Sequence, residues 1–254
     1  MAVRKFRHLD CRAYAPFGQL STGAAATGAD ATVTQIVAGG YRLQIYNSGV
    51  NTTNIFPVCI EDANCTNGWN MPSTNTDNVG FQMTVHAGAA LDDPNNVAVF
   101  TDGTDPAFYM KAKIGIPDVS DYDVFFVGFV EPAAYVATAA LTTTAHCLAA
   151  YDEKAGIALR DNAGDLGVFT SLNNVDVDSN ITDVAWLDDT VKILEVRVSA
   201  AGVVTCYIDS VEVVGMTAFT FANGTLVTPW IMMVKCANVA DTPPILNYLE
   251  WGYQ

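Results

Sequence analysis

Apolar and polar residues alternate along much of the chain, and this alternation predicts β-strands. Residues 192–214 alternate on both sides of a small-residue turn, which is the pattern of a β-hairpin. Between residues 107 and 116, apolar residues at the even positions alternate with Tyr109, Lys111 and Lys113. We therefore expect a strand with one buried face and one polar face in this region.

A second kind of strand is expected at residues 124–130, VFFVGFV, where nearly every side chain is apolar. Such a run predicts a strand that is covered on both faces, and Gly128 within it indicates close packing from a neighbouring strand. The residues that we expect to be buried in the domain are Phe126, Val196, Ile208 and Ile231.

Strand-like segments recur roughly every 10 to 15 residues with turn signals between them, as is typical of an antiparallel sandwich. We expect a β-sandwich domain over residues 31–254, with little helix, preceded by an extended N-terminal arm over residues 1–30. A long polar loop is expected at residues 61–78, which are rich in Asn, Thr and Pro. Long ordered loops often form functional surfaces.

The hairpin sequence LEVRVSAAGVVTCYIDSVEVV resembles the sheet-return hairpin of concanavalin A-like jelly rolls, the sandwich of lectins, laminin-G domains and glucanases. Its corner is Tyr207, Ile208, Asp209 and Ser210, with Ser where that family usually has Gly. The Thr-Pro-Trp start of an apolar strand at residue 228 and the aromatic-rich LNYLEWGYQ end are also similar to the family. The resemblance covers about residues 105–254 and implies an all-β, antiparallel two-sheet jelly-roll sandwich, a fold that serves many functions.

The charge of the chain is distributed unevenly. The net charge is −15, yet Arg4, Lys5, Arg7 and Arg12 lie within the first twelve positions, and Phe6, Tyr14 and Phe17 lie among and after them. We expect this arm to bind a neighbouring subunit through charge and apolar contacts; the alternative is an arm that folds back on its own sandwich. The acidic remainder is expected to repel nucleic acid and anionic membranes.

The composition also resembles that of structural proteins of tailed-phage virions, since Ala, Thr, Asn, Val and Gly dominate and Lys is rare. This resemblance implies a non-enzymatic capsid decoration or cement protein on the virion exterior, made in the host cytoplasm. Its partners would be the major capsid protein or other virion subunits, and closed symmetry favours a homotrimer. The alternative is a glycan-binding tail or fibre component that binds a surface glycan through the loop at residues 61–78.

The sequence lacks the patterns of a catalytic site. Glycosidases of this fold carry paired carboxylates about 5–5.5 Å apart, as in a Glu-x-Asp-x-x-Glu run, and no such run occurs here. The three histidines have no partner at ligand spacing, and there is no Gly-x-Ser-x-Gly turn. Glu195 and Arg197 share the polar side of one strand, where we expect a solvated face. We therefore expect no enzymatic activity and no cofactor.

One stretch of the sequence is a candidate metal site. Asp176, Asp178, Asn180 and Asp183 are oxygen donors at nearly alternate positions, as Ca²⁺ prefers, and an acidic turn is the alternative.

The polar loop holds the candidate sugar-binding residues. Trp69 would stack on a sugar and Asn70 would hydrogen-bond it, and a loop merely anchored by Trp69 is the alternative. Cys59 and Cys65 bracket a short polar segment and form a candidate disulfide, although free thiols are the default in a reducing cytosol. There is no run of about 18 apolar residues, so no membrane-spanning helix is expected, and the N-terminus lacks the apolar core of a secretory signal.

Overall fold

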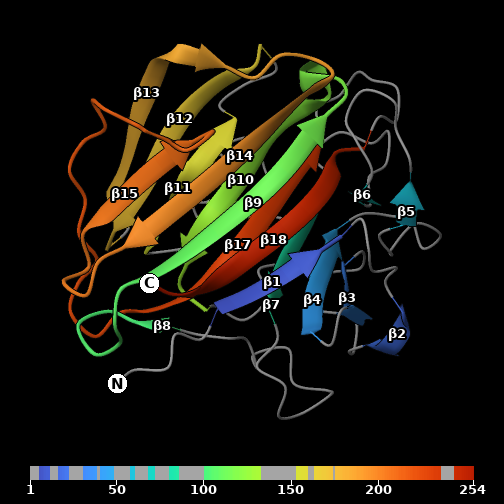
Figure 1. Cartoon of the computed structure of the whole chain (residues 1–254), viewed down its shortest axis with the longest axis horizontal. Coiled ribbons are helices and arrows are strands. Elements are labelled where there is room, and N and C mark those ends of the chain that lie inside the picture. The colour runs from blue at the N-terminus through green and yellow to red at the C-terminus, as the bar shows by residue number, and fades with distance from the viewer. Residues whose placement is uncertain are drawn as a thin grey trace.

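The computed structural model describes residues 6–11, 17–22, 31–38, 41–48, 58–60, 68–71, 80–85, 100–132, 153–159, 163–173, 175–235 and 243–254. These residues form two antiparallel sheets that pack face to face (Figure 1). Apart from one 3-10 turn, η1 (Val119–Asp121), none of the described residues is helical. Accordingly, no helix in this part of the chain has the length and apolar character to cross a membrane. The expected all-β, two-sheet jelly-roll sandwich is confirmed.

The sheet nearer the viewer in Figure 1, here called the front sheet, has the strand order β16-β15-β14-β9-β18-β6-β5, and β1 also pairs with β18. Its strands are β1 (Phe6–Asp10), β5 (Val58–Ile60), β6 (Gly68–Asn70), β9 (Phe108–Ile116), β14 (Thr190–Val198), β15 (Val204–Ile208), β16 (Val211–Glu212) and β18 (Ile245–Tyr253). The expected hairpin is formed by β14 and β15. A tight turn at Asp209 and Ser210, which both adopt positive φ, then leads to β16.

The second sheet, here called the back sheet, has the strand order β13-β12-β11-β10-β17-β7-β4-β3-β2, and β8 also pairs with β17. Its strands are β2 (Phe17–Thr22), β3 (Ala31–Ala38), β4 (Tyr41–Ser48), β7 (Gly80–Val85), β8 (Phe100–Thr101), β10 (Tyr122–Val130), β11 (Lys154–Leu159), β12 (Asp165–Leu172), β13 (Val175–Ala185) and β17 (Leu226–Lys235).

Strand alternation builds the core between the sheets. In β9 the even-numbered side chains are buried and the first three odd-numbered ones are half-buried, as their polarity predicts. Phe108 of β9 packs against Phe100 and against Phe129 of the back sheet, with ring centroids 4.7 Å and 5.1 Å apart. The four residues expected to be buried are all confirmed: Phe126, Val196 and Ile231 are 0% exposed and Ile208 is 4% exposed.

The outer face of the back sheet is buried around β10 and β17, so β10 is covered on both sides as its apolar run predicted. Phe126 of β10 and Met232 of β17 lie outside the core between the sheets, yet both are fully buried. The ring of Phe126 lies over Gly128 of its own strand and over Gly156 of the neighbouring strand β11. A Cβ at Gly156 would come within 2.4 Å of this ring, and one at Gly128 within 2.3 Å of the Ala155 carbonyl oxygen of β11. The close packing expected at Gly128 is therefore confirmed.

The N-terminal segment contributes strands to both sheets, which corrects the expected boundary at residue 30. β1 pairs with β18 along its whole length, and β2 pairs with β3. Leu9 and Cys11 are fully buried in the core. The chain folds back on its own sandwich here because pairing satisfies the backbone of β1 and because Leu9 gains burial. The sandwich therefore begins within the segment that was expected to be an arm.

Candidate functional site

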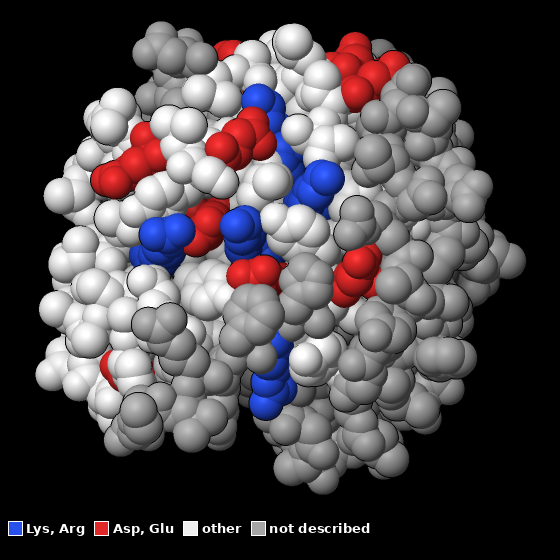
Figure 2. All heavy atoms as spheres, viewed as in Figure 1, with Lys and Arg blue, Asp and Glu red and all other residues white. Residues whose placement is uncertain are grey.

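The front sheet presents a polar outer face to solvent. Three of the protein's twelve basic residues, Lys111, Lys113 and Arg197, lie on this face, although the protein as a whole is acidic. Figure 2 shows Lys and Arg side chains gathered along the middle of this face, with Asp and Glu side chains beside them. The outward side chains Phe126 and Met232, in the middle of the back sheet, are buried, whereas Lys111, Lys113 and Tyr109 of the front face are partly exposed.

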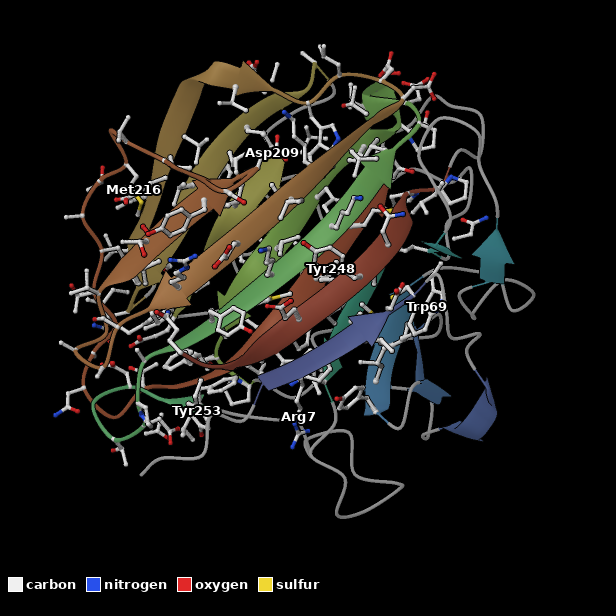
Figure 3. All side chains as sticks on the ribbon, in the orientation of Figure 1. Arg7, Trp69, Asp209, Met216, Tyr248 and Tyr253 are labelled. Carbon is white, nitrogen blue, oxygen red and sulfur yellow. The ribbon has the colours of Figure 1, made fainter. Side chains whose placement is uncertain are left out.

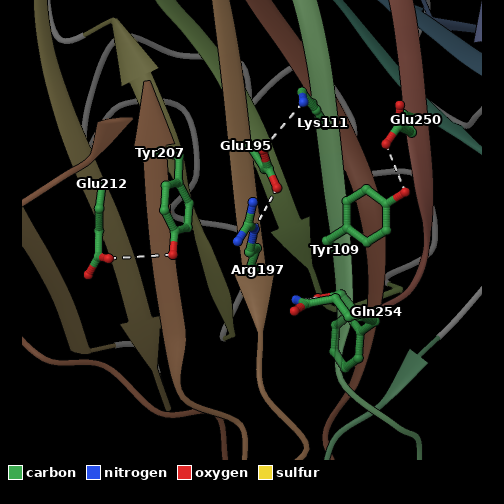
Figure 4. A network of polar contacts seen from close by, with 9 residues as sticks. Tyr109, Lys111, Glu195, Arg197, Tyr207, Glu212, Glu250 and Gln254 are labelled. Atoms are coloured by element: carbon green, nitrogen blue, oxygen red, sulfur yellow. Dashed lines mark hydrogen bonds and ion pairs between the residues drawn. The ribbon is translucent and has the colours of Figure 1, made fainter. Parts of the chain in front are cut away.

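Strand register aligns the polar side chains into rows across the front sheet. Glu195 of β14 lies opposite Tyr207 of β15 on one side and opposite Lys111 of β9 on the other. Lys111 in turn lies opposite Glu250 of β18, and Tyr207 lies opposite Glu212 of β16. Directly opposite residues of antiparallel strands share a face and interact. Five strands thus supply one continuous polar row (Figure 4).

Glu195 is the centre of this row. Its side chain is buried, with a residue exposure of 5%, and it has two cationic partners. Arg197 Nε donates a hydrogen bond to Glu195 Oε1 at 2.5 Å, and Lys111 Nζ lies 3.6 Å from Oε2. This hydrogen bond raises the pKa of Arg197 above its already high ordinary value. A buried carboxylate needs such partners, and the partners are in turn held in place by it.

Two tyrosines flank Glu195. The Arg197 guanidinium lies 4.2 Å from the ring centroid of Tyr207, within the range of a cation–π contact. On the other side, the Tyr109 hydroxyl donates a hydrogen bond to Glu250 Oε1 at 2.8 Å. Burial raises the pKa of Tyr109, and the bond to Glu250 raises it further. Tyr109 is therefore a fixed donor to Glu250.

A second row runs beside the first. Lys113 of β9 lies opposite Ile193 of β14 and opposite Tyr248 of β18, which Figure 3 shows on the near side of the sheet. Lys113 is half-buried and forms no ion pair with any described residue. By contrast, Lys192 at the start of β14 pairs with Asp209 at 3.1 Å. Lys113 is thus a cation of this face whose charge no described carboxylate neutralises within 4.0 Å.

The chemistry of the front face is that of hydrogen bonding and stacking. Glu195 and Glu250 are separated by β9 and by Lys111, and each carboxylate already accepts a hydrogen bond. Within the part of the chain that the structure describes, no group of three or more His, Cys, Asp and Glu side chains is arranged to hold a metal ion. Oriented charges and tyrosine rings on a rigid sheet suit the recognition of a polar ligand.

Trp69 is not available to a ligand, which corrects its expected role. It lies in β6, which pairs with β18, and it is 0% exposed as part of the core. Asn70 beside it is partly buried, and its Oδ1 has no hydrogen-bond partner in the described structure. The alternative, a Trp that anchors its segment, fits this burial, because an indole buried on every side cannot stack on a sugar.

The candidate Ca²⁺ ligands lie in a strand and not in a loop. Asp176, Asp178, Asn180 and Asp183 belong to β13, the outermost strand of the back sheet. In a strand, alternate residues are spaced by about 6.6–6.8 Å along the chain, whereas a calcium loop wraps its ligands around one ion at about 2.3–2.6 Å. The alternative of an acidic turn is therefore wrong for these residues, and the Ca²⁺ site stays a prediction.

The expected arm residues are only partly placed. The described ones are Phe6 and Arg7 in β1, where Arg7 is exposed, and Phe17 in β2. Arg4, Lys5, Arg12 and Tyr14 lie outside the described residues. Cys65 lies outside them as well, so the candidate disulfide with Cys59 falls outside the described residues. Anchoring by this segment stays a prediction.

A separate groove of about 350 Å³ lies between the start of β15 and residues 212–220. Its lining includes Val203, Met216 and Phe219, and Glu212 is its one ionisable side chain. The groove therefore lacks the combination of fixed charges and aromatic rings that the front face offers.

Sequence reasoning found part of the front face. The alternation placed Glu195 and Arg197 on the polar side of one strand, but it predicted a solvated face and not a connected network. The signal that was missed is the register between strands, which brings Lys111 and Glu250 to Glu195 from positions far apart in the chain. The tyrosines at alternate positions of β9, β15 and β18 were the available sequence signal.

Comparison with known proteins supports the fold alone. No family model and no curated protein matches the chain. Among solved structures, the carbohydrate recognition domain of Emp47p is 8% identical, with a TM-score of 0.50, and the match covers 85% of this chain and 89% of that one. The β-glucanase of Bacillus licheniformis is 8% identical over 98% of each chain, with a TM-score of 0.43. SO2946 from Shewanella oneidensis MR-1, a protein of unknown function, is 12% identical over 94% of this chain and 85% of that one, with a TM-score of 0.42.

The match to the carbohydrate recognition domain of Emp47p, with a TM-score of 0.50, is a match of fold. The expected concanavalin A-like sandwich is therefore the class of fold to which this protein is similar. At such low identity, the site residues of these proteins carry over to no position of this chain.

Proposed function

We propose that this protein is a non-catalytic glycan-binding domain and that the glycan lies across the outer face of the front sheet. The observation that carries this proposal is the row of preoriented charges and partly exposed tyrosines on one rigid sheet face. The carbohydrate recognition domain of Emp47p has a similar fold, so a jelly roll of this kind is compatible with sugar binding. The residues of the front face supply the chemistry that such binding needs.

Sugars present two chemical faces to a protein. Their hydroxyl groups require donors and acceptors in fixed positions, which Arg197, Lys111 and Glu250 offer on adjacent strands. Their C–H faces pack on aromatic rings, and Tyr207 and Tyr248 are half-buried rings on the same face. Because Glu195 already holds two of these groups, little side-chain entropy is lost when a ligand binds.

We expect no glycan hydrolysis at the front face, for a chemical reason. A glycosidase needs one carboxyl group to protonate the leaving oxygen and a second to attack or to activate water. On this face Glu195 is held by two cations and Glu250 accepts the Tyr109 hydroxyl, so both carboxylates serve as structural acceptors. A role in a virion, as a capsid decoration protein or as a tail or fibre component, stays a prediction, and so does the homotrimer. The glycan proposal depends on neither.

A glycan array with the purified protein tests the proposal. We expect binding to a restricted set of glycans, and we expect Tyr207→Ala to weaken it roughly fivefold, since an aromatic contact contributes on the order of 1 kcal/mol. The matched control is Tyr253→Phe, which removes only a hydroxyl that bonds to Asp105 at the far end of β18. Circular dichroism would verify that both variants keep the β-sheet spectrum. An array without any bound glycan, or unchanged binding by Tyr207→Ala, would overturn the proposal.

A further inference from the structure

We infer that the ligand of the front face is a short acidic oligosaccharide, whose carboxylate or sulfate group binds at Lys113. This inference rests on the proposed function and names the chemical class of its ligand. Three observations carry it: the grouping of three cations around few carboxylates, the absence of a described ion-pair partner for Lys113, and the limited width of the basic patch.

The first observation is the local charge. Lys111, Lys113 and Arg197 lie on neighbouring positions of β9 and β14, and the single carboxylate between them is Glu195. Glu195 is shared by two of the cations, because Arg197 and Lys111 approach its two oxygens. Lys111 also lies opposite Glu250, so the three cations face two carboxylates, and Lys113 is the one with no carboxylate directly opposite it among the described residues. Such a patch is complementary to a ligand that brings one negative charge to Lys113.

The second observation concerns Lys113 itself. The described residues that lie directly opposite it are Ile193 and Tyr248, neither of which is a carboxylate. Lys113 is half-buried, so its ammonium group has lost part of its hydration. No described carboxylate lies within 4.0 Å to replace that hydration. A carboxylate or sulfate oxygen would supply the charge-assisted hydrogen bond that Lys113 lacks. The ring of Tyr248 beside it offers a surface for the sugar that carries this anion.

The third observation limits the size of the anion. From β14 to β18 the patch spans two strand spacings, or roughly 9.6 Å. Glu212 bounds its row on one side and Glu250 on the other. A long polyanion such as nucleic acid would extend beyond these carboxylates onto an acidic protein, where repulsion opposes binding. A short saccharide with an isolated anionic group fits within the patch.

The test is one array that contains neutral, carboxylated and sulfated glycans, probed with three proteins. These are the wild type, Lys113→Gln, and the control Lys192→Gln, whose lysine pairs with Asp209. We expect the wild type to prefer acidic glycans. Lys113→Gln should lose roughly tenfold in binding to them, as the loss of one charge-assisted bond of about 1.5 kcal/mol predicts. Lys192→Gln should bind like the wild type. The carboxylated and sulfated sets show which anion Lys113 accepts.

The outcomes separate this inference from the proposed function. If the wild type binds only neutral glycans, or binds neutral and acidic ones equally, the glycan-binding function stands and the acidic ligand is wrong. Equal weakening by Lys113→Gln and Lys192→Gln would indicate a general charge effect and would also overturn the inference. If no glycan binds, both the proposed function and the inference fail. A normal β-sheet spectrum for each variant ensures that loss of binding reports on the site.

Discussion

The outer faces of the two sheets are built by the same alternation and yet differ in their exposure to solvent. On the front sheet the outward side chains of β9 are charged or aromatic and half-buried, as Lys111 and Tyr109 show. On the back sheet the outward side chains Phe126 and Met232 are apolar and fully buried. Polar side chains occur on this covered face too, such as Gln82 opposite Met232 and Thr84 opposite Trp230, but they are buried. Binding chemistry is therefore expected where one sheet face was left to water.

The strands β9 and β10 make this difference visible in the sequence. β9 reads FYMKAKIGI and alternates, whereas β10 reads YDVFFVGFV and is nearly all apolar. Both supply the same core from their inward residues, among them Phe108 and Phe129, whose rings meet. The inward side chains of both strands are thus apolar, whereas their outward side chains are polar in β9 and apolar in β10. The predictions below compare the two outer faces in decreasing order of the expected effect.

The largest effect is expected from Phe126→Ala on the back sheet. The ring lies over two glycines and is fully buried, so its removal leaves a cavity. We expect a loss of about 3–5 kcal/mol in the free energy of unfolding, measured by urea denaturation. The matched truncation on the front sheet, Tyr207→Ala, should cost about 1 kcal/mol through its lost contact with Arg197. Equal losses would show that the two faces do not differ as described.

A smaller effect is expected from Glu195→Gln at the centre of the front face. The amide keeps the size of the side chain but leaves Arg197 and Lys111 without their shared negative charge. Because both cations remain partly exposed to water, we expect a loss of about 1–3 kcal/mol in urea denaturation. Raising the salt concentration should reduce the difference from the wild type. A stability unchanged at low salt would mean that the network is not held through this carboxylate.

Tyr109→Phe should produce a still smaller change, which depends on pH. Loss of the hydroxyl that bonds to Glu250 is expected to cost about 1 kcal/mol at neutral pH. Burial raises the pKa of Tyr109 above its ordinary value of 10.0, so the folded protein holds this proton more tightly than the unfolded chain does. That stabilisation is complete below pH 10 and is lost as the pH rises above it.

The wild type should therefore lose stability above pH 10 more steeply than Tyr109→Phe, in thermal denaturation measured across the alkaline range. Tyr253→Phe is a useful reference, since burial raises the pKa of that tyrosine too. Parallel pH profiles for the wild type and Tyr109→Phe would contradict the described environment of Tyr109.

The smallest effect on stability is expected from Lys113→Gln. Lys113 forms no ion pair with a described residue, so its replacement should change the free energy of unfolding by less than about 0.5 kcal/mol. The same variant should lose the binding of acidic glycans. A residue that matters little for folding and much for binding marks the front face as a functional surface. A large destabilisation would instead assign Lys113 a structural role.

The sequence predicted the parts of the fold that depend on local pattern. Alternation identified the two faces of β9 and the hairpin of β14 and β15, and the apolar run identified β10 as a strand covered twice. The sequence pattern did not predict the strands whose conformation depends on partners far away in the chain. β1 is a strand because β18 lies beside it, and β13 is a strand because β12 pairs with it. Neither partner is visible in the local sequence.

The candidate site could be predicted only in part for the same reason. Glu195 and Arg197 are two residues apart, so their shared face follows from the pleat of one strand. Their contacts with Lys111 and the position of Glu250 depend on the order of β14, β9 and β18 in the sheet. Trp69 was misjudged because its neighbours in the sequence are polar, whereas its neighbours in space belong to the core. Local polarity is a poor guide to burial when the strand order is unknown.

The position of β18 has a consequence for how the protein is made. This strand, residues 245–253, lies beside β9 in the interior of the front sheet and also pairs with β1 and β6. Until the ribosome has released it, β1 and β6 have no neighbour through which to join β9, and one edge of β9 carries unpaired backbone groups. The front face would therefore form only after translation has passed residue 253. In a nascent chain, the exposed edge of β9 would be a target for chaperones or for mispairing with another copy.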